Sequence, residues 1–369
     1  YHAAVLGRSF RRVVLEALVA ADGLSLAGTI GVALDDYLED EGDTRVRFRD
    51  AVVRDVAYEG LSYRRRRALH ARAATAIEGL AGVDQAAVAE PLAMHFWLAG
   101  DAEGAWRYAV MAGDKARDGY SNVEATAQYR RALDAATRLD DVDDRELRAV
   151  WTALADVLEQ AGMFEEARAA LQSALRLTDD DPVARADLFL RRARTWTMSG
   201  SAANAKRNIT LGQKALQLEG PAEHRRAAAR LHSWKAGIAM NEGRPEVALE
   251  AALLALDEAT EAHDDDALAR SYVVVDWAYH MLGQPELATH GDQALEIFER
   301  LGQLNRASDV MNNRGGYAYF AGDWDEAVSW YRRSQDASHR AGDVVHAAYV
   351  GANAAEVLIG QRRYDEAAA

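Results

Sequence analysis

Apolar residues recur with helical spacing through most of the chain, and glycines interrupt this spacing at nearly even intervals. The anchoring glycines are Gly162, Gly200, Gly243, Gly283 and Gly322, and the intervals between them are 38, 43, 40 and 39 residues. Each glycine separates two helix-period segments and permits a tight reversal. The pattern therefore predicts a series of antiparallel helical hairpins.

An alanine follows each of these glycines by five residues, at Ala167, Ala205, Ala248, Ala288 and Ala327. A small side chain there would let the second helix of a hairpin approach the first closely. Packing residues surround the first pair: Trp151, Leu154, Ala155, Leu158, Leu171 and Ala174. Two further copies contain the sets Gly113, Ala125, Tyr129, Ala132 and Gly315, Gly322, Ala327, Tyr331.

These phrases resemble the tetratricopeptide-repeat (TPR) family over roughly residues 88–369. The resemblance implies a mainly α fold, in which residues 81–369 form a TPR-like α-solenoid of about six or seven hairpins. Intervals above the 34-residue consensus imply longer helices or loops. Both chain ends look like cuts in a longer protein, since the sequence starts without methionine and stops just after a repeat phrase.

Residues 1–80 follow another pattern. Ser9 is expected to cap a helix with Phe10, Val13, Val14, Ala17 and Leu18 on one face, and Ser25 a second helix with Leu26, Ile30, Leu34 and Leu38. An acidic turn at residues 39–43 then precedes a half-buried strand, in which arginines alternate with Val46 and Phe48. Asp50 is expected to cap a helix to about Glu59, and Ser62 one to about Leu80. This order predicts a small winged-helix-like domain over residues 1–80.

The net charge of −15 lies outside this first segment, because residues 1–80 contain 12 basic and 12 acidic side chains. An acidic surface repels nucleic acid and anionic lipid, and the candidate recognition helix at residues 25–41 has no Lys or Arg. We therefore expect neither DNA nor a membrane as a partner. The absence of cysteine and of a long apolar run favours the cytoplasm.

Four consecutive arginines, Arg64 to Arg67, stand in the first turn of a predicted helix, where the macrodipole disfavours cations. Because successive helical residues rotate by about 100°, the four side chains spread around the helix. Two interpretations remain open. The arginines could pair with the acidic run at residues 35–43, or they could dock against an adjacent domain.

The phrase "VRFRDAVVRDVAYEGLSYRRRRALHARAA", with "AAVLGRSF" before it and "HFWLAGDAEGAWRYAVMAGDKA" after it, resembles bacterial STAND-type AAA ATPases just beyond their nucleotide-binding module. The resemblance covers residues 1–138. It implies an upstream nucleotide-binding domain as a partner, with ATP and Mg²⁺ bound there, and an adenylate or guanylate cyclase output in many members. Asp50 stands where the family usually has a nucleotide-sensing histidine, and a carboxylate there would repel a phosphate. Asp50 and Arg64, Arg65, Arg66 and Arg67 are the implied interdomain contacts.

No phosphate-binding loop, zinc-protease helix or nucleophile elbow occurs, so we expect no catalytic residue, metal or cofactor in this chain. The acidic run at residues 263–270 fits a helix cap better than a metal site. Trp151, Trp196 and Trp324 match packing positions of the repeat, so we expect them in the core.

If the repeat register is right, the first helices of the hairpins line a concave groove. The groove candidates share this placement and are Arg194, Arg230, Asn241, Arg270, His280, Asn312 and Tyr319. Arginine and asparagine can hold carboxylates and backbone amides, which suits a protein, peptide or small effector. The chain is therefore predicted to be a regulatory sensor segment of a cyclase-linked ATPase. A stand-alone TPR scaffold and the sensor arm of a transcriptional regulator are the alternatives.

Overall fold

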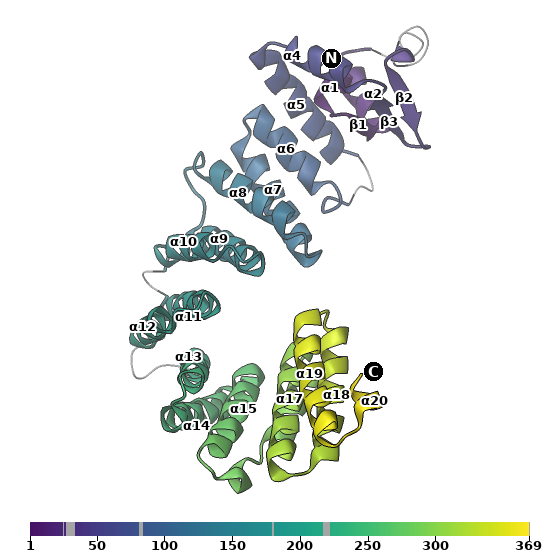
Figure 1. Ribbon diagram of the computed structural model, residues 1–369. Coiled ribbons are helices and arrows are strands. Elements are labelled where there is room, and N and C mark those ends of the chain that lie inside the picture. The colour runs from purple at the N-terminus through teal and green to yellow at the C-terminus, as the bar shows by residue number, and fades with distance from the viewer. Residues whose placement is uncertain (25, 27–33, 81–83, 179–180, 217–221, 369) are drawn as a thin grey trace. The chain divides into compact units, whose positions relative to one another are not determined.

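The chain folds into two compact units, residues Tyr1–Leu177 and Thr178–Ala369, which are described separately (Figure 1). The structure is a computed structural model that describes all residues except 25, 27–33, 81–83, 179–180, 217–221 and 369. The fold is mainly α, a solenoid of TPR-like helical hairpins, with one small sheet near the N-terminus. No helix in the described ranges is long and apolar enough to cross a membrane.

The first unit opens with a three-stranded antiparallel sheet of order β1-β3-β2. Its elements are α1 (His2–Val5), β1 (Ser9–Arg11), α2 (Arg12–Ala20), β2 (Leu38–Glu41) and β3 (Arg45–Phe48). Val46 and Phe48 are buried while Arg45 and Arg47, which alternate with them, are exposed, as the pattern predicted. The Phe10 and Phe48 rings meet edge to face, with centroids 6.2 Å apart.

Three predictions for this segment are wrong. Ser9 does not cap a helix, because Ser9–Arg11 pairs with Arg45–Arg47 as a strand and α2 begins only at Arg12. The apolar face of α2 is consequently shifted, with Val14, Leu15, Leu18 and Val19 buried and Val13 exposed. Leu38 and the acids at residues 39–41 form strand β2, since they pair with β3 rather than extending a helix or a turn. The predicted cap at Ser25 lies outside the described residues.

The rest of the first unit is helical. Asp50 caps α4 (Ala51–Glu59) as predicted, because its Oδ1 accepts a 2.8 Å hydrogen bond from the Val52 backbone N–H. Ser62 precedes α5 (Tyr63–Glu78) but makes no side-chain cap bond, and α5 ends two residues before the predicted Leu80. Consecutive helices then pack in order: α6 (Ala89–Ala99), α7 (Ala102–Asp118), α8 (Asn122–Ala136), α9 (Asp144–Gln160) and α10 (Phe164–Leu175).

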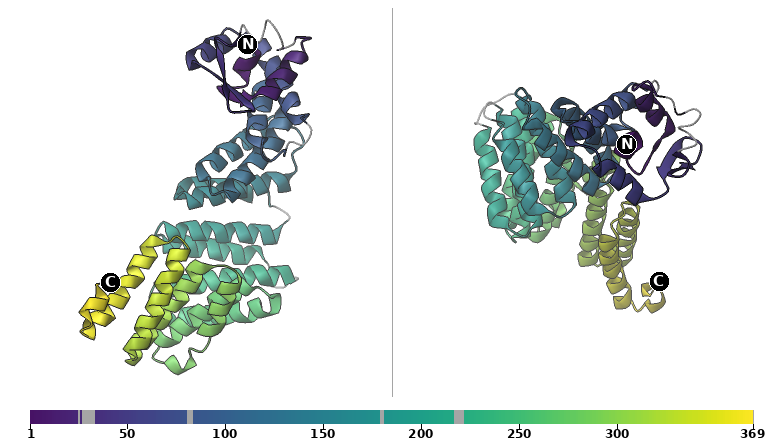
Figure 2. Two further views of the ribbon diagram at one scale, coloured as in Figure 1. Left: turned by 90° about the vertical axis from the view of Figure 1, so that its right-hand side faces the viewer. Right: turned by 90° about the horizontal axis from the view of Figure 1, so that it is seen from above.

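The second unit is a run of helical hairpins, and Figure 2 shows them following one another in chain order. Its helices are α11 (Pro182–Met198), α12 (Ala202–Ala215), α13 (Ala222–Asn241), α14 (Pro245–Ala262), α15 (Asp265–Met281), η1 (Pro285–Leu287), α16 (Gly291–Arg300), α17 (Leu304–Ala321), α18 (Trp324–Arg340), α19 (Val344–Gly360) and α20 (Tyr364–Ala367). The first helices α11, α13, α15 and α17 also contact one another in sequence. They therefore form a continuous row.

The predicted repeat register is confirmed for four of the five hairpins. All five anchoring glycines have positive φ, between 69° and 88°, which a side chain would strain. Ala167, Ala205, Ala248 and Ala327 are fully buried in second helices. Ala288 is the exception: it follows η1 outside any α-helix, and Ala294 of α16 is buried instead.

The displaced start of α16 has a visible cause. The buried Asp276 carboxylate of α15 accepts hydrogen bonds from the backbone N–H of His290, at 2.9 Å, and from its ring Nδ1, at 2.8 Å. These bonds hold the residue just before α16, so the helix begins at Gly291. The core prediction for the tryptophans is also wrong at Trp324, which opens α18 and is 43% exposed, whereas Trp151 and Trp196 are partly buried.

Candidate ligand groove

The predicted groove residues all lie on the row of first helices in the second unit. Arg194 is on α11, Arg230 and Asn241 on α13, Arg270 and His280 on α15, and Asn312 and Tyr319 on α17. The structure gathers four of them around two neighbouring cavities. We call these the Arg230 cavity, of about 160 Å³, and the Ser233 cavity, of about 180 Å³.

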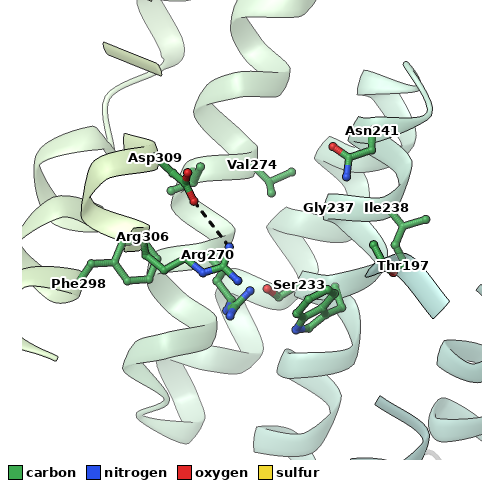
Figure 3. A pocket seen from close by; sticks show the side chains of 12 residues that line it. Thr197, Ser233, Gly237, Ile238, Asn241, Arg270, Val274, Phe298, Arg306 and Asp309 are labelled. Carbon is green, nitrogen blue, oxygen red and sulfur yellow. Dashed lines mark ion pairs between the residues drawn. The ribbon is translucent and has the colours of Figure 1, made fainter. Parts of the chain in front are cut away.

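The two cavities share Trp234 and Arg270. Arg194 and Arg230 line only the Arg230 cavity, together with Asp187, Arg191 and Asp266. Asn241 lines only the Ser233 cavity, whose other walls come from α11, α13, α15, α16 and α17. Residues far apart in sequence thus meet in one place, and Figure 3 shows the Ser233 cavity.

Arginines surround Trp234. The guanidinium carbon of Arg270 lies 5.1 Å from a Trp234 ring centroid, and that of Arg194 lies 5.9 Å away. Both distances are within cation–π range, so the indole helps to hold two cations side by side. Burial, and then the nearby charge of Arg306, lower the pKa of Arg270 below its ordinary value.

Carboxylates partly neutralise these arginines. Arg270 Nε donates to Asp266 at 2.9 Å, and Arg230 Nε donates to the buried Asp264 at 2.7 Å. Asp264 also caps α15 by accepting from the Ala267 N–H at 3.0 Å. This confirms that the acidic run at residues 263–270 serves as a helix cap. The described residues contain no group of three metal-ligating side chains.

Arg306 and Asp309 bring a looser pair of charges to the Ser233 cavity. Arg306 Nη1 lies 3.8 Å from Asp309 Oδ2, and His346 Nε2 lies 3.5 Å from Asp309 Oδ1. Burial is the main cause that raises the pKa of Asp309. Sequence reasoning missed both residues, although Asp309 stands three residues before Asn312 and Arg306 three residues before Asp309, so that each is a neighbour of the next along α17.

Ser233, Trp234 and Gly237 were missed as well. They stand three, four and seven residues after Arg230, a spacing that places them on the same face of α13. Extending each predicted groove residue along its helix would have found them.

The remaining groove candidates line neither cavity. His280 stacks on Tyr317 with ring centroids 3.5 Å apart, and burial lowers the pKa of His280. Asn312 Oδ1 accepts a 3.1 Å bond from Asn353 Nδ2 of α19, and Tyr319 packs its ring edge on Phe320. The structure therefore separates these three residues from the arginine group.

The arginines of α5 mainly hold helix ends. Arg66 donates to the carbonyl oxygen of Glu59, the last residue of α4, at 2.8 Å. It also donates to the carbonyl oxygen of Leu61, two residues beyond that helix, at 3.0 Å. Arg67 Nε donates to the Ala99 carbonyl at the end of α6, at 2.9 Å. The carbonyl end of a helix favours cations, and this offsets the unfavourable position of the arginines in their own helix.

The interpretation that Arg64 to Arg67 pair with the acidic run is wrong. The described ion pairs of residues 39–41 are made with other arginines, namely Arg12, Arg45, Arg47 and Arg49. The reason is topological. Strand β2 lies beside β3, so its carboxylates meet the arginines of that strand and its neighbours. Arg65 instead lies over the Tyr1 ring, 5.6 Å from its centroid.

Comparison with known proteins agrees with the fold. A family model described as tetratricopeptide repeat matches residues 148–191. No curated protein matches the sequence. Solved structures that resemble the chain include the apo form of the quorum sensor NprR from B. thuringiensis. It has 14% identity and a TM-score of 0.58, and the match covers 96% of this chain and 93% of that chain.

Two further solved structures have TM-scores of 0.51 and 13% identity. One is a Signal Transduction ATPase with Numerous Domains (STAND) protein with a tetratricopeptide repeat sensor from Pyrococcus horikoshii. The match covers 100% of this chain and 54% of that chain, so the present chain spans about half the length of the STAND protein. The other is a Rap protein complexed with Competence and Sporulation Factor, with 95% and 90% coverage. At these identities the likeness shows only the fold of the chain, which is a TPR-type helical solenoid.

Proposed function

We propose that this chain is a non-catalytic sensor segment that binds a protein or peptide effector along the first helices of its second unit. The observation that carries the proposal is the groove itself, where arginines, aspartates and a tryptophan from successive first helices line two adjoining cavities. Paired charges beside an aromatic surface suit a ligand that offers both polar backbone groups and apolar side chains. The solved neighbours include a quorum sensor and a factor-bound Rap protein, which is consistent with this role.

The first unit would connect the sensor to an adjoining nucleotide-binding domain, in which ATP and Mg²⁺ would bind. Helix α4 supports this proposal, since none of its residues is buried and Val52 and Val56 are 64% and 65% exposed. Such an apolar face beside exposed arginines is suited to a domain contact. The sheet order β1-β3-β2 favours a winged-helix-like adaptor over residues 1–80. The full-length protein would lie in the cytoplasm, and its output domain would be a cyclase or, alternatively, a transcriptional regulator.

A stand-alone TPR scaffold remains the second candidate. It shares the groove but needs no partner for the α4 face. The two are distinguished by changing that face and reading nucleotide hydrolysis or cyclase output in the full-length protein.

The groove is tested by selecting peptides from a random display library on the chain. We expect selected peptides to bind at least tenfold more weakly to the triple variant Arg230→Ala, Arg270→Ala, Asn241→Ala, whose three side chains line the cavities. A matched control removes two cations and one amide elsewhere, through Lys206→Ala, Arg300→Ala and Gln361→Ala, whose partners lie outside both cavities. Equal binding by the folded triple variant, or failure to select any peptide, would contradict the proposal.

The interdomain contact is tested with Arg64→Ser and Arg65→Ser. These two side chains make no backbone hydrogen bonds in the described structure, unlike Arg66 and Arg67, so the fold should keep its stability to within about 1 kcal/mol. The nucleotide response of the full-length protein should change. Tight, salt-sensitive DNA binding by the chain would argue instead for a nucleic-acid role.

A further inference from the structure

The Ser233 cavity has a charged end that carries both signs. Arg306 and Asp309 lie one turn apart on α17 and are paired only loosely, at 3.8 Å, while Arg270 approaches from α15. Figure 3 shows Asp309, Arg306 and Arg270 grouped on one side of the cavity, with the ion pair drawn dashed. Because Arg270 is neutralised by Asp266, the whole cluster has no net charge when all four groups are ionised.

The opposite side of the cavity carries no charged group and has open space beside Gly237. Figure 3 places Gly237 and Ile238 across from the charged group, together with Thr197 and Asn241, and Val274 between the two sides. A Cβ built on Gly237 would meet no atom within 4 Å, although this glycine lies inside α13, four residues before its end. A cavity of about 150 Å³ holds a benzene ring, so one of about 180 Å³ has room for a leucine-sized or phenyl-sized side chain.

A buried hydroxyl belongs to a residue in the wall of the same cavity. Ser233 is buried, and its Oγ has no hydrogen-bond partner among the described residues. Leaving a buried hydroxyl unpaired is unfavourable, whereas a ligand oxygen or nitrogen in the cavity would satisfy it. This group therefore points independently to a polar ligand atom.

We propose that the Ser233 cavity binds a free α-amino acid with a branched aliphatic or aromatic side chain. The α-carboxylate would accept hydrogen bonds from Arg270, Arg306 and the Ser233 hydroxyl, the α-ammonium would donate to Asp309, and the side chain would occupy the space beside Gly237. The inference goes beyond the proposed function, because it assigns to one of the two cavities a ligand that is not a peptide, and it requires no adjoining domain.

Charge selects this ligand over its fragments. A carboxylic acid without the ammonium group would place a second negative charge beside Asp309, and an amine without the carboxylate would place a positive charge beside two arginines. A zwitterion matches the neutral cluster at both ends. A residue inside a peptide has neither charge, so it would lose both contacts.

The first experiment is calorimetric titration of the chain with L-leucine and L-phenylalanine, compared with 4-methylpentanoate, 3-methylbutylamine and N-acetyl-leucinamide. At least one of the two amino acids should bind at least tenfold more tightly than each of the three fragments. The inference is overturned if neither amino acid binds, or if 4-methylpentanoate binds as well as leucine. Neither outcome touches the peptide selection, so failure here is distinguishable from failure of the proposed function.

The second experiment fills the cavity. Gly237→Leu should reduce amino-acid affinity at least tenfold without loss of folding, because leucine is a better helix former than glycine and the space is open. Gly360→Leu is the matched control, since Gly360 is helical with equally open surroundings but lies outside the cavity, and it should bind as the wild type does.

A third variant keeps the test decisive if Gly237→Leu fails to fold. Asp309→Asn should remove the preference for leucine over 4-methylpentanoate while leaving binding of the latter equal or stronger. An unchanged preference would overturn the assignment of the ammonium group to Asp309, and with it the inference.

Discussion

Two hairpins, one in each unit, use the same packing device. In α7–α8 the glycine Gly113 faces the ring of Tyr129, and in α17–α18 the glycine Gly315 faces the ring of Tyr331. Both tyrosines follow their glycine by 16 residues, and in both a Cβ on the glycine would come within 2.6 Å of the ring. The two contacts are therefore copies of one repeat position, in which a missing side chain admits an aromatic ring.

The polar groups around the two hairpins differ. The Tyr129 hydroxyl donates to Asp114 at 2.8 Å, whereas the Tyr331 hydroxyl makes no hydrogen bond to another described residue. Near α7, further polar groups are paired with each other: His70 and His95 are fully buried, with their Nδ1 atoms 2.9 Å apart. Helix α17 instead presents Arg306 and Asp309 to a cavity. The comparison teaches that apolar packing defines the repeat, while the pairing of polar groups decides which hairpins can offer them to a ligand.

The largest expected effect concerns the buried histidines. Burial is the main cause that lowers the pKa of His70 to about 4 and that of His95 to about 3, whereas an unfolded histidine titrates near 6.5. Because the pKa of each histidine is lower in the folded than in the unfolded state, the contribution of the two neutral histidines to stability is fully present above about pH 6.5. This contribution is lost as the pH falls toward 4. Lowering the pH from 7.5 to 5.0 should therefore reduce the free energy of unfolding by about 2 kcal/mol for each histidine, or by about 4 kcal/mol for the pair.

Hydrogen exchange of backbone amides measures this loss unit by unit. Helices α5 and α6 should lose protection at pH 5.0 more than α14 of the second unit does, after correction for intrinsic exchange. The double variant His70→Asn, His95→Asn should remove most of the difference, because asparagine can hydrogen-bond without titrating in this range. Equal acid sensitivity of the two units would show that the histidine pair is not the cause.

Much of the fold could be predicted from the sequence because its determinants are local. Each anchoring glycine takes a left-handed conformation after a helix, and the buried alanines follow at a fixed distance. Where prediction failed, a distant residue decided the outcome. Ser9 became a strand because β3 lies beside it, and α16 starts late because the buried Asp276 holds His290.

The candidate site was predictable only in part, for a related reason. Helical spacing assigned Arg230, Arg270 and Asn241 to the groove face, and the structure places them on cavity walls. The cavities themselves arise where side chains from several helices leave space, and no spacing rule along one helix describes that. The unpaired Ser233 hydroxyl and the open side of Gly237 become meaningful only with these neighbours in place.

An intermediate effect tests whether the repeat contact is equally tight in both units. Ala167→Leu in the first unit and Ala327→Leu in the second should each lower the free energy of unfolding by roughly 1–3 kcal/mol, because each alanine is fully buried. Ala288→Leu should change it by less than about 0.5 kcal/mol, since this residue is outside the helix contact. Urea denaturation of the three variants measures these values. A loss at Ala288 as large as at Ala327 would mean that the hairpin anchored by Gly283 packs as the others do.

The smallest effect tests the polar difference between the two hairpins directly. Tyr129→Phe should cost about 1 kcal/mol, because it removes the hydrogen bond to Asp114 while the ring still fills the space opposite Gly113. Asp114 is partly exposed and keeps Arg117 at 3.1 Å, which limits the loss. Tyr331→Phe should be near neutral, since it removes a hydroxyl that has no partner among the described side chains. Urea melts of both variants, with Tyr129→Phe repeated in an Asp114→Ala background, give the coupling energy of the pair. Two results would contradict this difference between the hairpins: equal losses of stability in both phenylalanine variants, or a loss at Tyr129 that persists in the Asp114→Ala background. Either result would mean that the hydroxyls act through packing alone.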